Sequence, residues 1–451
     1  MFSKKRKDIS SLHVPHNKNT AGCTPVAMAC PKEVLLPMNM HYGAAAIPVV
    51  EVGDHVRVGQ LIAREDETSI SSPVHATISG TVVEIGPLAL PNGKETTAIR
   101  IESDGKMELD PNVQPPKYPE NLDEFLELCR LSGVVGLGGA AFPVWKKLDA
   151  ARTAEIDTIL VNGAECEPYI TSDHRMMLDH SDLVADGMYM MKQFIGCKKC
   201  VICIESNKAD AIALLREKFA GDDSMEVREL NTVYPQGAKQ VLLYNVTGKV
   251  TMQGQRMANL GVLIINVSSL AKVAYYIRTG MPLVDRIVTV DGSAVAEPKN
   301  LIVPIGTRVS ALLEEVGTKA EPGKVLIGGP MLGRAVGTLE DPIVKATSAI
   351  LAMNKKDAKL SEPSACIHCG RCVAVCPMGV DPTTINKATL QEEADPKTRY
   401  EILIKAGTRQ CIECACCSYV CPAHRPLMEV NKQGYAFARG YEKAQKGGVK
   451  A

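Results

Sequence analysis

The chain has 451 residues, more than one hydrophobic core normally organises, so several domains are expected. Lysine plus arginine and aspartate plus glutamate both number 51, and this formal neutrality argues against nucleic-acid binding through a general basic field. Sixteen cysteines in a chain without a signal-peptide pattern predict thiolate ligands in a reducing compartment rather than a disulfide framework.

Residues 1–29 are expected to form an N-terminal extension. Residues 4–7 are basic, but no apolar run follows them, so the pattern of a secretory signal peptide is missing and a cytosolic location is predicted. No uncharged apolar stretch approaches the ~20 residues that a spanning helix needs. The best candidate, Leu260–Val267, has the length of a strand. Any membrane association is therefore expected to be peripheral.

Residues 30–109 alternate short β-rich runs with turn signals such as Gly53-Asp54 and Asn92-Gly93, which predicts a small β-domain. The phrases "VGDHVRVGQLIA" and "SSPVHATISGTVVEI" resemble the two halves of a biotinyl/lipoyl-like barrel-sandwich domain. No lysine lies between Val74 and Thr81, where the hairpin tip would carry a swinging cofactor. The domain is therefore interpreted as structural or docking, and not as a carrier arm.

A proline-rich linker, residues 110–119, leads into an expected α/β domain over residues 120–282. Its first feature is the glycine-rich segment Gly136–Pro143, followed by a helical run with Lys146 and Lys147. Glycines let backbone N–H groups approach an anion, and a following helix N-terminus adds its dipole. The alternative interpretation of this segment is a tight turn without a ligand.

The next feature is a predicted buried strand, Asp157–Val161, that runs into Asn162–Pro168. Sheets of α/β proteins place ligand-binding residues at strand ends. Glu165 and Glu167, close to Asn162, are candidates to orient a ring amide and ribose hydroxyls. The alternative is a solvated acidic turn, because acids in loops are usually only exposed.

The cysteines at 197, 200 and 203 have the spacing of three cluster ligands but no fourth Cys-Pro partner. Val201, Ile202 and Ile204 indicate a buried strand, and residues three apart on a strand face opposite sides of the sheet. These three thiols are predicted to be buried and not to bind metal.

Residues 283–345 predict a separate small domain. Arg286–Asp291 has the pattern of a strand, "VSALLEEVG" that of a short amphipathic helix, and "KVLIGGP" that of a strand running into a turn. No catalytic constellation is visible there.

Residues 358–430 contain the strongest signal, two copies of one Cys-x2-Cys-x2-Cys-x3-Cys-Pro pattern. Three thiolates at i, i+3 and i+6 let one tight loop wrap three corners of a [4Fe–4S] cubane, and the fourth is directed at the other cluster. The prediction is two clusters with crossed ligands. The first is held by Cys366, Cys369, Cys372 and Cys421, and the second by Cys411, Cys414, Cys417 and Cys376.

A pair of zinc sites is the alternative, but zinc favours isolated Cys-x2-Cys pairs and leaves the x3-Cys-Pro element unexplained. The 34 residues between the motifs include a helix-like stretch, Pro382–Glu393, which indicates added helices around the clusters. Cys416 is predicted to be a packing residue. The tail, residues 431–451, is expected to be a frayed or docking helix.

Several phrases together resemble the C subunits of Rnf ferredoxin:NAD oxidoreductase complexes. They are "GLGGAAFP", "NGAECEPY", "VYPQGAKQ", "INVSSLAKVAYYIRTGMP" and "GGPMLG". The flavin module is also similar to the 51-kDa NADH-oxidising subunit of respiratory complex I. The resemblance implies a multidomain α/β plus β fold. Its parts are a barrel-sandwich hybrid, a Rossmann-like FMN- and NADH-binding domain, a β-grasp (SLBB-like) domain and a helical ferredoxin domain with two [4Fe–4S] clusters.

The resemblance further implies a ferredoxin:NAD oxidoreductase subunit that binds FMN and NAD(H) and exchanges electrons with its clusters. By this likeness Phe142 stacks on the nucleotide, Lys147 meets a phosphate, and Glu165 and Glu167 take the catalytic role. The remaining cofactor contacts implied are Gly136, Gly138, Gly139, Ala140, Asn162, Asn266 and Ser269. Relative to the complex I pattern, Leu137 replaces an arginine and Ala164 an aspartate, which removes two polar contacts.

The resulting hypothesis is a peripheral subunit on the cytoplasmic face of the cell membrane, with ion pumping in other subunits. Its partners are those subunits, including a ferredoxin-type iron–sulfur protein. Three alternatives stay open at this point: a cobalamin-reductase-type flavin and iron–sulfur subunit, a flavin-less electron relay, and an assembly scaffold. The first characteristically begins close to the glycine-rich loop, whereas about 130 residues precede it here.

Overall fold

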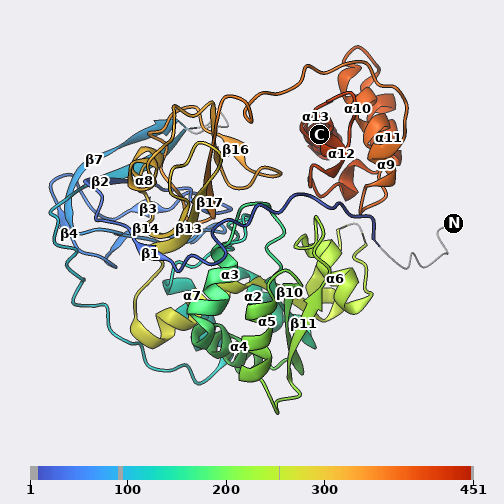
Figure 1. Cartoon of the computed structure of the whole chain (residues 1–451). Coiled ribbons are helices and arrows are strands. Elements are labelled where there is room, and N and C mark those ends of the chain that lie inside the picture. The colour runs from blue at the N-terminus through green and yellow to red at the C-terminus, as the bar shows by residue number, and fades with distance from the viewer. Residues whose placement is uncertain (1–8, 90–94, 253, 448–451) are drawn as a thin grey trace. The chain divides into compact units, whose positions relative to one another are not determined.

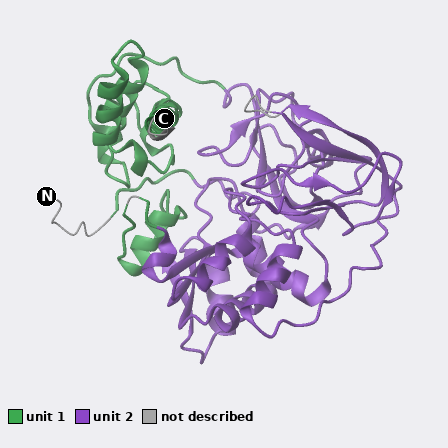
Figure 2. Ribbon diagram, turned by 180° about the vertical axis from the view of Figure 1, so that it is seen from behind, with its two compact units in different colours: residues 1–15, 231–255, 359–451 green, residues 16–230, 256–358 purple. Residues whose placement is uncertain are grey.

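The structure is a computed structural model that describes residues 9–89, 95–252 and 254–447. Two compact units divide the chain (Figure 2). The larger consists of residues 16–230 and 256–358, and the smaller of residues 1–15, 231–255 and 359–451. The basic residues 4–7 and the predicted Asn92-Gly93 turn lie outside the described residues.

The β-domain of the larger unit contains two antiparallel sheets. One has the strand order β2-β8-β7-β4 and the other β3-β5-β6. Alternate residues point inward, so Val34, Val82 and Ile101 meet in register and are fully buried. The strands are β2 (Glu33–Pro37), β3 (Ile47–Pro48), β4 (His55–Val56), β5 (Leu61–Arg64), β6 (Val74–His75), β7 (Gly80–Ala89) and β8 (Glu95–Ser103).

A four-stranded parallel sheet with the order β11-β10-β9-β12 forms the centre of the α/β domain (Figure 1). From β9 the chain adds β10 and β11 on one side and then returns to add β12 on the other. The sheet therefore has a topological switch point between β9 and β12, where such sheets bind ligands. The strands are β9 (Thr158–Gly163), β10 (Lys199–Glu205), β11 (Met225–Leu230) and β12 (Val262–Asn266).

The cysteines at 197, 200 and 203, which have the spacing of three cluster ligands, lie at this sheet, as predicted. Cys200 and Cys203 are on β10 and fully buried, and Cys197 precedes the strand. Their predicted burial is confirmed, and the expectation that they bind no metal stays a prediction.

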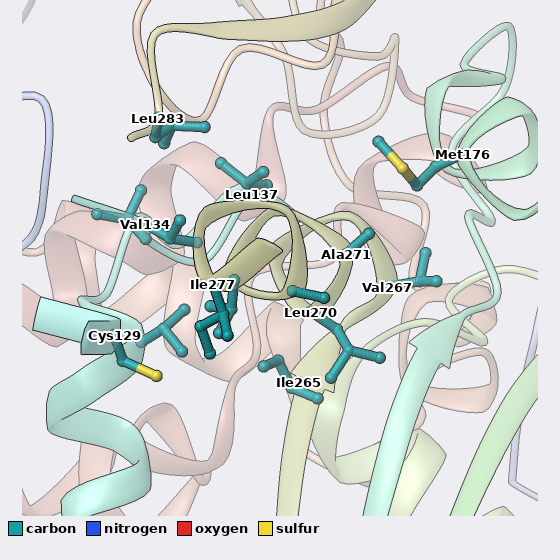
Figure 3. Close-up of a cluster of buried hydrophobic side chains, with 14 of the residues drawn as sticks. Cys129, Val134, Leu137, Met176, Ile265, Val267, Leu270, Ala271, Ile277 and Leu283 are labelled. Carbon is teal, nitrogen blue, oxygen red and sulfur yellow. The ribbon is translucent and has the colours of Figure 1, made fainter. Parts of the chain in front are cut away.

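Helix α7 lies at the centre of the hydrophobic core of this domain (Figure 3). Its buried Leu270 points toward Ile265 of β12 and its Ile277 toward Cys129 of α1, while Leu137 of the glycine-rich loop lies on the opposite side of the helix. This packing fixes the loop against the helix. The helices are α1 (Leu122–Leu131), α2 (Val144–Leu148), η1 (Asp149–Arg152), α3 (Ser172–Asp179), α4 (Ser181–Ile195), α5 (Ala209–Lys218), η2 (Met257–Leu260) and α7 (Val267–Thr279).

A six-stranded sheet with the order β1-β14-β13-β17-β15-β16 forms the third part of the larger unit, with α8 (Val309–Val316) packed on it. The N-terminal extension contributes β1 (Val26–Ala27), which pairs in parallel with β14. The sheet also includes β17 (Ala349–Met353), beyond the predicted end at residue 345. The other strands are β13 (Asp285–Asp291), β14 (Lys299–Pro304), β15 (Lys324–Ile327) and β16 (Arg334–Ala335).

The cysteine-rich part of the smaller unit is helical. Asp381 and Asp395 each accept a backbone N–H of the helix that follows, and a proline begins both helices, which explains where α10 and α11 start. The predicted tail helix is part of a packed element, since Tyr441 stacks on Tyr400 with ring centroids 4.7 Å apart. The helices are α6 (Lys239–Thr247), α9 (Arg371–Ala374), α10 (Pro382–Leu390), α11 (Pro396–Lys405), η3 (Thr408–Gln410), α12 (Cys416–Tyr419) and α13 (Leu427–Gly447).

Candidate functional site: a switch-point crevice and two cysteine cavities

The switch point of the parallel sheet brings two predicted site residues together. Asn162 at the end of β9 and Asn266 at the end of β12 are register partners. The side-chain oxygen of Asn266 accepts the N–H of Ser269 and caps α7, while that of Asn162 accepts the N–H of Ala164. Both amides therefore lie at the carboxyl ends of adjacent strands, the edge at which such sheets bind ligands, which is called the crevice below.

The glycine-rich loop folds back on itself above this crevice. The N–H of Gly136 donates to the carbonyl of Phe142 (2.9 Å). Ser269 ties the loop to α7, because its hydroxyl accepts the N–H of Leu137 (2.8 Å) and lies 3.0 Å from the carbonyl of Val135. Ser269 thus acts on the loop itself, and its predicted contact with the cofactor stays a prediction.

Two glycines of the loop have separate reasons to be glycine. A Cβ on Gly138 would come within 3.3 Å of the Asn266 side-chain nitrogen, so the loop approaches the end of β12 closely. Gly139 has φ +110°, and a Cβ there would meet no atom within 4 Å. Its backbone, and that of the exposed Ala140, is therefore accessible to a ligand.

The helix expected after the loop, α2, is only five residues long and begins at Val144. The ammonium group of Lys147 donates to the carbonyl of Ile264 on β12 (3.1 Å). This contact holds the lysine at the wall of the crevice. The predicted contact of Lys147 with a phosphate group of the cofactor stays a prediction.

Glu165 caps helix α3. Its carboxylate accepts the N–H groups of Asp173 (2.6 Å) and His174 (3.1 Å), and its backbone has φ +50°. Burial raises its pKa to about 7. The acidic loop is therefore not the solvated turn that was the alternative interpretation.

Glu167 is the acid with an uncommitted atom. Its Oε2 accepts the N–H of Met331 (3.2 Å) in the "GGPMLG" loop, and a Cβ on Gly329 would lie 2.3 Å from the same oxygen. Oε1 is buried and has no hydrogen-bond partner within the described residues. Burial raises the pKa of Glu167 to about 7.

Sequence reasoning missed Asp173, which links the crevice residues. Its carboxylate accepts the side-chain N–H of Asn266 (2.7 Å) and the hydroxyl of Ser268 (2.5 Å). Burial raises the pKa of Asp173. The only sequence signal for Asp173 as a site residue is its position a few residues after the Asn162–Pro168 motif.

Sequence reasoning also missed Lys18. Its ammonium group donates to the backbone carbonyls of Glu165 (2.8 Å), Glu167 (2.8 Å) and Ile170 (2.5 Å). Burial lowers its pKa to about 8. No motif surrounds Lys18, and it lies 147 positions before Glu165 in the chain, so no local pattern signals this contact.

These features fit a flavin nucleotide. The crevice offers an accessible glycine backbone and the uncommitted Oε1 of Glu167, and protein hydrogen bonds hold two strand-end amides in place beside them. Phe142 lies beside Tyr42, with ring centroids 5.5 Å apart, and adds aromatic surface at the loop. A planar ring with polar edges and a phosphate is the class of ligand that this combination suits.

The cysteines gather around two cavities in the smaller unit. The first has a volume of about 300 Å³, and three cysteines of the first motif and one of the second line it: Cys366, Cys369, Cys372 and Cys421. The second is lined by three cysteines of the second motif and one of the first: Cys411, Cys414, Cys417 and Cys376. Cys416 is buried and also lines the second cavity.

The two ligand loops have the same backbone conformation. His368 and Glu413 occupy matching places with φ +54° and +55°, and Gly370 and Ala415 follow with φ +73° and +61°. Four cysteines line each cavity, which fits a cubane, in which each thiolate binds a different iron.

Comparison with known proteins gives four domain matches. Residues 9–106 match the RnfC barrel sandwich hybrid domain, 129–275 the Nuo51 FMN-binding domain, 287–335 the SLBB domain and 358–422 a 4Fe-4S dicluster domain. These matches confirm the predicted fold class, and with it FMN and two [4Fe–4S] clusters as the cofactors.

Three curated relatives are each 37% identical to the chain. The C subunit of the Na(+)-translocating ferredoxin:NAD(+) oxidoreductase complex of Acetobacterium woodii aligns with 83% of this chain and 85% of its own length. Its proton-translocating counterpart from Clostridium ljungdahlii aligns with 87% and 86%. The C subunit of the ion-translocating oxidoreductase complex of Rhodobacter capsulatus aligns with 82% and 72%.

The chain belongs to this family of C subunits. The Rnf-type resemblance predicted from the motifs is thereby confirmed. A crystal structure of an NAD+-reducing [NiFe]-hydrogenase has a TM-score of 0.46 at 18% identity, over 64% of this chain and 53% of its own, which is too low to support an argument. Among the described residues of this Rnf-type protein, no helix is long and apolar enough to span a bilayer.

Proposed function

We propose that this Rnf-type protein handles NAD(H) for an ion-translocating ferredoxin:NAD oxidoreductase complex, and that it moves electrons between its two clusters and NAD through FMN. One observation carries the proposal. A single chain places a switch-point crevice with buried acids and an accessible glycine loop in the same protein as two four-cysteine cavities. Electrons are expected to enter or leave the clusters through a ferredoxin-type iron–sulfur subunit.

FMN, when bound, supplies the exchange between hydride on NAD(H) and single electrons. The chain's own residues bind and orient it. We assign the backbone of Gly136, Gly138, Gly139 and Ala140 to phosphate and nucleotide contacts, with Lys147 adding positive charge. Asn162 and Asn266 present amides at the ends of adjacent strands. Glu167 can hold a proton or accept a hydrogen bond at Oε1, since burial raises its pKa to about 7.

The crossed ligation of the clusters is part of the proposal. The lining of the two cavities supports it, because each cavity has the fourth cysteine of the other motif in its wall. We further propose that the protein docks on the cytoplasmic face of the membrane through its partners, and that ion translocation takes place in those partners.

The proposal is tested by flavin binding and bleaching. When flavin-free protein is titrated with FMN, the fluorescence of FMN should be quenched until one FMN is bound per chain. NADH should then bleach the bound flavin in the absence of oxygen. Protein that binds no FMN would support the relay or scaffold instead. Flavin and clusters that NADH reduces and that added cobalamin then reoxidises, where added ferredoxin does not, would support the cobalamin-reductase alternative.

A further inference from the structure

The first ligand loop, residues 366–372, is more exposed than the second, residues 411–417, although the two have the same backbone conformation. Ile367 and Ile412 occupy matching places, and the first is 66% exposed whereas the second is half-buried. Likewise Cys369 is exposed, whereas its counterpart Cys414 is half-buried. The conformation of the loops therefore does not account for the exposed surface of the first one.

Apolar side chains extend this exposed surface onto the neighbouring helices. Val373 on α9, directly after the first ligand loop, is exposed, and Leu390 at the end of α10 is 55% exposed. Leu390 and Ile367 both line the first cysteine cavity, so they lie around the same opening. Exposed apolar side chains that gather at one place mark surfaces that bind another molecule.

The charged side chains that line the first cavity are all basic. They are Arg371, Lys387 and Arg425, and no aspartate or glutamate is among the described residues of its wall. The next acids along the chain, at 392 and 393, do not line it. The second cavity has the opposite character, with Glu413 and no lysine or arginine among the described residues that line it. Basic groups around an apolar centre complement a partner of negative charge.

We propose that the surface formed by Ile367, Arg371, Lys387 and Leu390, called the first-cluster face below, docks an acidic electron-transfer protein that holds an iron–sulfur cluster of its own. The inference rests on the proposed function and deepens it, because it assigns the exchange of electrons with the partner to one of the two cysteine motifs. Neither the domain matches nor the names of the relatives assign such a face.

The exposure of the first ligand loop explains why the partner docks there. Electron transfer between proteins slows steeply with distance, and a partner can approach an exposed loop more closely than a half-buried one. In each transfer the reduced partner is oxidised by one electron and the cysteine-rich part of the chain is reduced by one, with no bond formed and no proton moved. Interfaces of electron-transfer partners are small, below about 1,200 Å², so a few side chains around one opening suffice.

The first test is calorimetric titration of the protein, with its cofactors reconstituted, with an oxidised two-[4Fe–4S] ferredoxin of net negative charge. The wild type should bind it, and more weakly as salt is added. Lys387→Glu should weaken binding by about tenfold, because it replaces an attraction with a repulsion. The matched control is Lys405→Glu, since both lysines are exposed and lie in the last turns of their helices, α10 and α11. Its affinity should equal that of the wild type.

The apolar part of the face is tested in the same titration. Leu390→Ser should weaken ferredoxin binding about threefold or more, because it removes apolar area that the partner would cover. Ile402→Ser, which removes an exposed apolar side chain of α11, is its control and should bind as the wild type does.

The second test compares two reductants by time-resolved absorbance of the clusters. Lys387→Glu should lower the rate of reduction by reduced ferredoxin about tenfold at low ionic strength, and less at high ionic strength. It should leave unchanged the rate with photochemically generated deazaflavin radical, a small uncharged donor, and the iron content of the protein. Lys405→Glu should match the wild type with both reductants.

The outcomes separate the two proposals. Failure of ferredoxin to bind the wild type, equal affinities of Lys387→Glu and Lys405→Glu, or equal losses with both reductants would overturn the docking face. Sedimentation with vesicles of anionic lipid that Lys387→Glu abolishes, while ferredoxin binding is unaltered, would make the face a membrane contact instead. Ferredoxin that binds through Lys387 and reduces the clusters, in a protein whose flavin NADH does not bleach, would support the face and overturn the proposed electron transfer to NAD.

Discussion

At the scale of single residues, buried charge distinguishes the crevice from an ordinary loop. Four buried charged residues are found there: Glu165, Glu167, Asp173 and Lys18. Burial raises the pKa of the three acids and lowers the pKa of the lysine, which in each case favours the neutral form. Perturbed ionisation of this kind is concentrated at functional sites. The residues could be singled out individually from sequence only where a motif contained them, which explains why Lys18 and Asp173 were missed.

Glu167→Gln should make stability less dependent on pH. Because the folded-state pKa is raised from 4.5 to about 7, the folded protein binds more protons in that interval, and its free energy of unfolding falls as pH rises through it. At about 1.4 kcal/mol per pKa unit, the glutamine variant should gain up to about 3 kcal/mol at pH 8 and nothing near pH 4. Guanidinium unfolding at both pH values measures this.

The control for this prediction is Glu315→Gln, at an exposed position on α8. It should leave the unfolding midpoint unchanged at both pH values. A Glu167→Gln variant that is no more stable than the wild type at pH 8 would show that the carboxyl is stabilised there by contacts that a glutamine cannot make.

Lys18→Met should weaken FMN binding by about tenfold or more. The variant leaves three carbonyls of the acidic loop without their donor, and each hydrogen bond to a charged group contributes about 1.5–3 kcal/mol. Fluorescence titration of flavin-free protein gives the Kd. Lys32→Met, at an exposed position just after the N-terminal extension, serves as the control. Equal Kd values for the two variants would mean that Lys18 does not position the loop.

At the scale of elements, the two ligand loops share one backbone conformation, and each contributes a cysteine to the cavity of the other. Each has left-handed residues at the same two places, which turn the backbone tightly between cysteines. The fourth cysteine of each motif follows a four-residue helix, α9 or α12, and lies at the cavity of the other loop. The spacing alone predicted this exchange, because it is a local property of the chain.

Iron content of double variants tests the exchange. Cys366→Ala with Cys421→Ala removes two ligands of one proposed cluster, so about four irons should remain. Cys366→Ala with Cys376→Ala removes one ligand from each, so both clusters should be lost. Cys416→Ala should retain the full complement. Uncrossed ligation predicts the reverse: the first double variant should lose both clusters and the second should keep about four irons. Iron and sulfide analysis of anaerobically purified protein decides between crossed and uncrossed ligation.

At the scale of the whole molecule, sequence reasoning recovered what local patterns record. The parallel strands, the glycine-rich loop and the cysteine motifs all have short-range signatures, and the fold class was confirmed. Contacts between segments that are distant in the sequence have no short-range signature. The pairing of β1 with β14, the hydrogen bonds from Lys18 to the acidic loop and the contact of Glu167 with Met331 join residues that lie far apart along the chain, so only the folded structure shows them.

The relay from NADH to the clusters is the central claim for the whole chain. Its most direct test is anaerobic addition of NADH to the reconstituted protein, followed by electron paramagnetic resonance of the clusters. Reduced-cluster signals should appear together with flavin bleaching, and they should be missing from the same protein stripped of FMN. Signals of equal size in the stripped protein, or bleached flavin with clusters that stay oxidised, would contradict the account.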